Sequence, residues 1–250
     1  SFAVESGKNS AKLAGAGDLA KTTSGTVLLS GANILTGNIG VSDGSLGVTG
    51  AGKLTTGTVT LSAGSAQLDL GKTTQVVGRL LLTAGTVQNG TLTVNGGSFE
   101  VQSGLITANL AGTAALNKAT SGDVTLLATS TYSGATTITQ GSLILGVNNA
   151  LLSSGSVNVS GGTLALGNTS QAIGTMNLYS GNVTGSGTLT ANSAFNVMSG
   201  AVSAILAGFM VRSAMWGSMM RDRRDQNTAL TAEGEALRAD KNALVVEQNT

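Results

Sequence analysis

Two long stretches of this sequence match each other at a fixed distance along the chain. Residues 13–46 align with residues 110–143 without a gap, at an offset of 97, with 14 identities in 34 positions. The match continues at an offset of 96, where residues 68–104 correspond to residues 164–200. Self-similarity at a fixed period predicts an architecture that stacks similar units.

The repeat stops near Gly208, and the composition changes at the same position. Leu206-Ala207-Gly208 stands where a third copy should begin, but the residues that follow do not continue the pattern. Residues 1–208 hold 35 of the 37 glycines and 13 charged side chains, whereas residues 209–250 hold 2 glycines and 12 charged side chains. We therefore expect a domain of two repeats of about 97 residues over 1–208 and a different segment over 209–250.

Within 1–208 the commonest local pattern is a glycine, a small polar residue and then an aliphatic one, as in Gly162-Thr163-Leu164. Alternation of apolar and polar residues follows, as in Leu68-Asp69-Leu70 and Leu164-Ala165-Leu166. This pattern predicts turns that feed short strands of about three to five residues with one buried face. We expect Leu68, Leu70, Leu164 and Leu166 to form part of an interior ladder.

Such short strands suit a solenoid, in which each coil contributes one strand to each long parallel sheet. Coils of about 20 residues give four or five per repeat, on the order of ten in all, and a rod about 50 Å long. The chain contains no proline, which fits a fold in which every coil offers N–H groups to the next. The predicted class is all-β, a parallel β-helix (β-solenoid) with a C-terminal α-helical tail.

Two segments of the second repeat, residues 116–126 and 131–146, resemble the autotransporter-associated β-strand repeat of secreted bacterial passenger domains. Residues 19–48 are a degenerate copy, and residues 157–167 resemble the strand pair that commonly follows. The resemblance implies a right-handed parallel β-helix displayed outside the cell. It brings no catalytic residues with it.

Composition argues against most site chemistry. The chain has no cysteine and no histidine, so the thiolate nucleophile, the commonest general base and the usual zinc ligands are missing. Asp69 and Glu100 have no second carboxylate at a fixed spacing, and we interpret them as surface charges rather than a glycosidase pair. With a net charge of +1, no nucleic-acid surface is indicated. We expect no catalytic residue, no cofactor and no metal, and a protein that is not an enzyme.

The segment from residue 209 onward has a different pattern. Leu230, Leu237 and Leu244 recur at a spacing of seven beside alanines spaced three and four apart, which predicts an amphipathic helix. It could cap the solenoid, pair with another helix in an oligomer, or be a mere appendage. The apolar junction over 209–220 contains Trp216 and is too short for the roughly 20 residues of a membrane span. Trp216 and the three leucines form a candidate interface.

These observations lead to one preferred hypothesis and two alternatives. The preferred one is a non-enzymatic structural solenoid, extracellular or on the bacterial cell surface, that forms a rigid shaft or fibre. The first alternative is a self-associating adhesin passenger domain, and the second is a carbohydrate-active β-helix enzyme. Expected partners are other copies of the chain or neighbouring surface proteins, with no nucleic acid and no transmembrane span.

Overall fold

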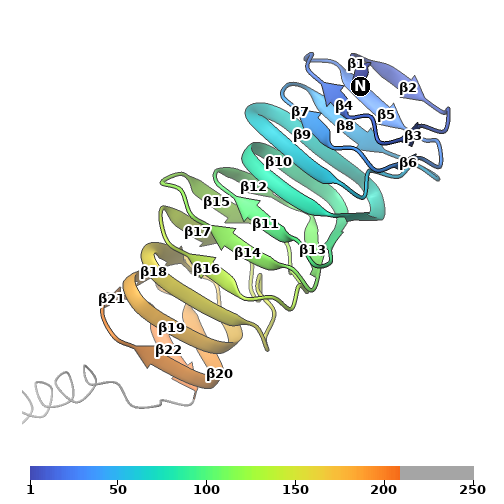
Figure 1. Ribbon diagram of the computed structural model, residues 1–250. Helices are drawn as coiled ribbons and strands as arrows, with labels where there is room; N and C mark the ends of the chain where they lie inside the picture. Colours follow the sequence, from blue (N-terminus) through green and yellow to red (C-terminus); the bar gives the residue numbers. More distant parts are fainter. Residues whose placement is uncertain (209–250) are drawn as a thin grey trace, which may run out of the picture. The chain divides into compact units, whose positions relative to one another are not determined.

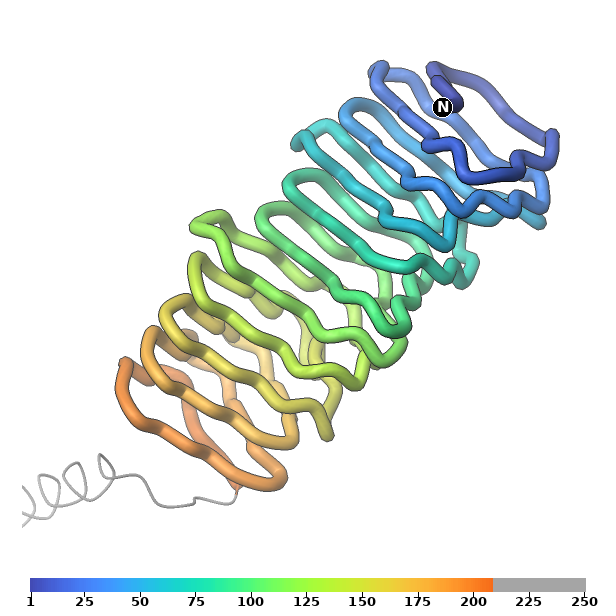
Figure 2. The backbone as a smooth tube through the Cα atoms, viewed as in Figure 1, coloured from blue at the N-terminus to red at the C-terminus, as the bar shows by residue number. Residues whose placement is uncertain are grey.

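The computed structural model describes residues 1–208, which contain 22 strands and no helix. The backbone coils into a stack of similar turns, with each turn lying directly beside the one before it (Figures 1 and 2). Every strand pairing is parallel. The predicted all-β parallel solenoid is therefore confirmed, whereas the expected helical tail over 209–250 lies outside the described residues.

The strands follow one another along the whole described chain. They are β1 Phe2–Val4, β2 Gly7–Asn9, β3 Ala14–Gly15, β4 Leu19–Lys21, β5 Thr26–Leu29, β6 Ile34–Leu35, β7 Ile39–Val41, β8 Ser45–Val48, β9 Thr58–Val77, β10 Arg79–Val94, β11 Ser98–Val101, β12 Gly104–Ile106, β13 Asn109–Gly112, β14 Ala115–Lys118, β15 Asp123–Leu126, β16 Thr136–Ile138, β17 Ser142–Leu145, β18 Ser156–Ala165, β19 Gln171–Thr184, β20 Thr188–Val197, β21 Ala201–Val202 and β22 Ile205–Gly208.

Each turn has three faces, and β10 runs along all of them. Its residues Leu80–Leu82 pair with β11, Thr86–Val87 with β12, and Thr91–Val94 with β13. We call the stacks that contain these three segments face 1, face 2 and face 3. The solenoid thus encloses its core between three parallel ladders.

Face 1 defines the number of turns, because one outward-facing column runs through it without interruption. Numbered from turn 1 to turn 11, its members are Ala3, Ala20, Gly40, Thr60, Leu81, Glu100, Asn117, Thr137, Asn158, Asn177 and Asn196. Ten steps of about 4.8 Å give a stack about 48 Å long.

Each 97-residue repeat makes five turns, so turn 2 corresponds to turn 7 and turn 4 to turn 9. The change of offset from 97 to 96 arises within turns 3 and 4, where one segment of the first repeat is one residue shorter and the next is two residues longer. The pairs that show this are Leu46/Leu143 at 97, Val59/Val157 at 98 and Leu68/Leu164 at 96.

The expectation that strands span three to five residues is wrong in five long elements. Strands β9, β10 and β19 have 20, 16 and 14 residues, and β18 and β20 have 10 each. They continue round the corners because irregularities in register let an extended chain bend. Gly85 sits at one such corner with φ 111°, and a Cβ there would lie 2.3 Å from the Ala66 carbonyl oxygen.

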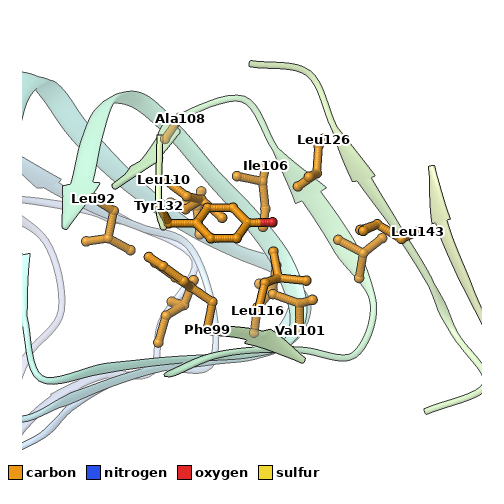
Figure 3. Packing of buried hydrophobic residues seen from close by; sticks show 14 of the residues in the cluster. Leu92, Phe99, Val101, Ile106, Ala108, Leu110, Leu116, Leu126, Tyr132 and Leu143 are labelled. Carbon is orange, nitrogen blue, oxygen red and sulfur yellow. The ribbon is translucent and has the colours of Figure 1, made fainter. Parts of the chain in front are cut away.

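The interior is a continuous apolar core made from the inward-facing columns. Most of its members are leucine, valine and isoleucine, and nearly all of them are fully buried. Phe99 and Tyr132 are the large exceptions in the middle of the stack, with ring centroids 5.7 Å apart and planes tilted by 53°. Figure 3 shows both rings surrounded by aliphatic side chains such as Leu110 and Leu116.

A charge introduced into this interior should be far more damaging than the same charge one residue away. Leu166 is fully buried, whereas its neighbour Ala165 belongs to an outward column with Ile144 and Thr184. We expect Leu166→Asp to lower the free energy of unfolding by roughly 4 kcal/mol or more. Ala165→Asp should change it by less than about 1 kcal/mol. Urea unfolding followed by circular dichroism measures both, and similar midpoints would contradict the assignment of the inward face.

Candidate functional site: surface ladders and buried polar residues

The four leucines expected in the interior ladder lie on face 2 and are fully buried. Leu68 pairs with Leu46 in the preceding turn and Val87 in the following one. Leu164 is likewise flanked by neighbours above and below, Leu143 and Val183. Leu70 and Leu166 follow two residues later in the same two turns. Trp216, Leu230, Leu237 and Leu244 lie outside the described residues.

A row of asparagine side chains runs along face 1 at the C-terminal end of the solenoid. Asn177 Nδ2 donates to Asn158 Oδ1 at 2.7 Å, and Asn196 Nδ2 donates to Asn177 Oδ1 at 2.8 Å. We call Asn158, Asn177 and Asn196 the amide ladder. Asn177, in the middle of the row, both donates and accepts along the axis, so the row repeats the spacing of the backbone beneath it.

Two large side chains are exposed beside the amide ladder. Tyr179 is 46% exposed and Met198 is 66% exposed. Each lies two residues beyond a ladder asparagine, Asn177 or Asn196, and therefore on the same outward side of face 1. Aromatic and methionine side chains are enriched in protein interfaces, so this patch is a candidate contact surface on face 1.

The two acidic residues considered as a catalytic pair lie on different faces. Asp69 is on face 2, where Asn89 Nδ2 donates to its carboxylate at 3.0 Å. Glu100 is on face 1, where it accepts from Asn117 Nδ2 at 2.8 Å and lies 3.7 Å from the Arg79 guanidinium. Their interpretation as separate surface charges agrees with this placement.

Two lysines are fully buried, whereas hydropathy places lysine at the surface. Lys21 and Lys118 occupy equivalent places in the two repeats, at inward positions of face 1. In its column Lys21 takes the place of an aliphatic residue, between Val4 and Val41. A charged residue kept at an inward position in both repeats is the signal that could have identified them.

Each buried ammonium group binds backbone carbonyls at the corner between faces 1 and 2. Lys21 Nζ donates to the Thr23 carbonyl and, at 3.1 Å, to the Asp43 carbonyl. Lys118 Nζ repeats this arrangement with the carbonyls of Thr120 and, at 3.1 Å, Gln140.

Gly141 adjoins the second of these corners with φ 61°, and a Cβ there would lie 2.6 Å from Lys118 Nζ. Burial lowers the pKa of Lys118, and the charge of Asp123 opposes part of that shift. The lysines thus satisfy carbonyls that the tight corner turns inward.

Two buried glutamines on face 3 also satisfy backbone groups, in each case groups of the preceding turn. Gln171 Oε1 accepts the Ala150 N–H at 2.8 Å, and its Nε2 donates to the Val147 carbonyl at 2.6 Å. In the first repeat Gln75 makes the corresponding bonds, to the Leu54 N–H at 3.0 Å and the Gly52 carbonyl at 3.2 Å. Here too the signal was an identity between the repeats at an inward position.

Nothing in residues 1–208 assembles a metal centre, because no three histidine, cysteine, aspartate or glutamate side chains lie close enough together there. Within the same part of the chain, no helix is long and apolar enough to cross a membrane. The main chemical feature of the described surface is its rows of hydrogen-bonding side chains, such as the amide ladder.

No family model, no curated protein and no solved structure matches this chain.

Replacing one buried glutamine by an apolar side chain of similar size should lower the free energy of unfolding. Gln171→Leu leaves the Ala150 N–H and the Val147 carbonyl without partners. We expect a loss of roughly 2–4 kcal/mol in the free energy of unfolding, since two buried backbone groups become unsatisfied. Gln140→Leu, at an exposed side chain, is the matched control and should change stability by less than about 0.5 kcal/mol. Equal effects in urea unfolding would contradict the assigned role.

The buried phenol of Tyr132 predicts a loss of stability at alkaline pH. Its hydroxyl lies 2.6 Å from Thr136 Oγ1, and burial raises the pKa of Tyr132 while this hydrogen bond lowers it in part. Above pH 10 the unfolded chain releases the phenol proton and the folded chain retains it. The folded state then binds more protons, so stability falls by up to about 1.4 kcal/mol per pH unit.

Tyr132→Phe should reduce this alkaline slope, whereas Tyr179→Phe, at an exposed ring, should leave it unchanged. The free energy of unfolding in urea at pH 9, 10 and 11 tests this for all three proteins. Lys118 acts in the opposite direction just below pH 10.5, because a lysine with a lowered pKa favours folding as pH rises. Since Lys118 is present in every variant, it cancels in the comparison. Identical slopes for wild type and Tyr132→Phe would rule out the proposed cause.

Proposed function

We propose that this chain is an extracellular structural solenoid that forms a rigid shaft on the bacterial cell surface. The observation that carries the proposal is the unbroken parallel pairing of face 1 through eleven turns. Bending such a stack requires stretching backbone hydrogen bonds on one of its faces. Stiffness along the axis is therefore a direct consequence of the fold, and it suits a spacer that holds a surface away from the cell.

The location rests on the resemblance of residues 116–146 to the autotransporter-associated repeat and on composition. A chain without cysteine crosses an oxidising compartment without forming wrong disulfides. We take the coil to be right-handed, as that resemblance implies and as parallel crossovers in one sheet almost always are. In this proposal the working parts are the backbone ladders and the stacked aliphatic side chains, and no catalytic residue is involved.

A second function, adhesion by self-association, is supported by the patch on face 1. The amide ladder with exposed Tyr179 and Met198 combines ordered hydrogen-bonding groups with apolar area. Another copy could bring the same kind of row against it, which would join rods side by side. This function and the first share a fold and differ in how the rods associate.

Electron microscopy of the negatively stained protein separates these functions. A displayed shaft should give single straight rods, at least about 48 Å long from the eleven turns alone. Self-association should give lateral bundles. Asn177→Asp and Asn196→Asp together should disperse them, because the rows of two associated rods would then carry carboxylates that repel each other. Compact particles with no long axis would contradict both functions.

Location is tested separately on intact cells of the organism that produces the protein. Antibodies raised against residues 1–208 should label the cell surface, and a protease added outside should remove the label. Labelling only after the cells are permeabilised would contradict an extracellular shaft.

A further inference from the structure

A groove of about 480 Å³ opens on face 3 across three successive turns of the first repeat. It is lined by residues 33–36 of turn 2, 50–56 of turn 3 and 73–76 of turn 4. Two exposed aliphatic side chains flank it, Ile34 and Val76. The groove lies where the first repeat departs from regular stacking.

Backbone pairing on face 3 is interrupted at this groove. Leu35 forms a bridge with Thr55 in the next turn, and the end of β9, from Thr73 to Val77, pairs with β10. Between Thr55 and the end of β9 no strand pairing exists in the described residues. Regular contact between turns 3 and 4 resumes where the Gly78 N–H donates to the Gly57 carbonyl at 2.9 Å.

The interruption leaves two backbone donors of turn 4 without acceptors. On face 3, outward-facing residues direct their N–H groups to the preceding turn, as Thr36 does to Gly15 at 3.0 Å and Thr131 to Leu110 at 2.8 Å. Thr74 and Val76 are outward-facing residues of turn 4, so their N–H groups point to turn 3 and into the groove. Within residues 1–208 neither N–H has a hydrogen-bond acceptor on turn 3.

The second repeat covers the equivalent donors with a peptide segment of its own. Asn148 Oδ1 accepts the Ser170 N–H at 2.9 Å, and Asn149 Oδ1 accepts the Ala172 N–H at 3.1 Å. The Asn149 N–H in turn donates to the Ser170 carbonyl at 3.0 Å. Two neighbouring asparagines thus satisfy both donors and add one backbone bond.

The first repeat lacks these side chains. Thr74 and Val76 correspond to Ser170 and Ala172 at the offset of 96. The segment that should cover them reads Gly-Ala-Gly-Lys-Leu over residues 50–54 and carries no side-chain carbonyl. Lys53 instead adds a positive charge to the lining of the groove.

We propose that this groove binds an extended acidic peptide of a partner protein, whose carbonyl or carboxylate oxygens accept the N–H groups of Thr74 and Val76. Donors on alternate residues of a strand lie about 6.6 Å apart, a spacing that alternate groups of another extended chain match. The second repeat shows that carbonyl oxygens can reach and satisfy both donors at such an edge. Lys53 makes a carboxylate the better acceptor than an amide by charge complementarity.

Synthetic peptides test the proposal on the full 250-residue chain by calorimetry. The first peptide, Leu-Gly-Val-Asn-Asn-Ala-Leu-Leu, copies residues 145–152, which cover this edge in the second repeat. The second replaces both asparagines by aspartate, and the third replaces both by alanine. We expect the aspartate peptide to bind at least tenfold more tightly than the alanine peptide, with the asparagine peptide between them. Equal affinities, or no binding by any of the three, would overturn the proposal.

Two proline variants locate the binding site. Val76→Pro removes a donor that has no acceptor, and proline is tolerated at such positions of a strand. It should weaken the aspartate peptide at least tenfold and change the melting temperature little. Ala172→Pro, the matched control, removes the N–H that Asn149 accepts, so it should lower the melting temperature and leave peptide binding unchanged.

A charge variant keeps the proposal testable if Val76→Pro does not fold. Lys53 is exposed, so Lys53→Glu should fold normally, weaken the aspartate peptide at least fivefold and leave the asparagine peptide nearly unaffected. Unchanged binding of the aspartate peptide in this variant, or in a folded Val76→Pro protein, would place the peptide elsewhere and overturn the assignment.

Discussion

Hydrogen bonds between the backbones of successive parallel turns are the interaction on which this solenoid depends. Inward residues donate to the following turn, as Leu19 does to the Asn38 carbonyl and Leu116 to the Ala135 carbonyl. Outward residues donate to the preceding turn, as Thr36 does to Gly15. Most residues of the ladders thus donate to one neighbouring turn, and a proline at any of those positions would break a bond. The inward side chains of the three faces meet in the interior, and most of them are aliphatic.

The corners are the point at which backbone pairing alone is insufficient. Where the chain changes face, some carbonyl and amide groups point into the core, and buried groups of this kind require partners. Lys21 and Lys118 satisfy carbonyls at one corner, and Gln75 and Gln171 satisfy both kinds of group near another. Buried charge usually suggests a reactive site. In this chain the burial of the two lysines is explained by the geometry of the corner, because each ammonium group donates to backbone carbonyl oxygens there.

The sequence predicts the regular part of this structure well and its exceptions poorly. Alternation over Leu68-Asp69-Leu70 and Leu164-Ala165-Leu166 identifies inward and outward residues because strand side chains have a period of two. Lys118 escapes the same reasoning, since hydropathy places lysine outside and only the three-dimensional corner provides its partners. The groove was also unpredictable from pattern, because it depends on which turn lies beside residues 73–76. The candidate interface at Trp216 and the leucines of the tail stays a prediction.

The two repeats serve as an internal comparison, since one backbone plan carries two sets of side chains. Inward places are kept, as at Lys21/Lys118 and Leu68/Leu164. Outward places on the same strands change freely, as at Asp69/Ala165. Stability therefore constrains the interior, and differences in function between the halves have to reside in the outward columns and in segments that cover strand edges. The exchange of Asn148-Asn149 for a segment without side-chain carbonyls is a difference of the second kind. It leaves two donors free without altering the core beneath them, so a binding surface can appear in one repeat while the shaft itself stays intact.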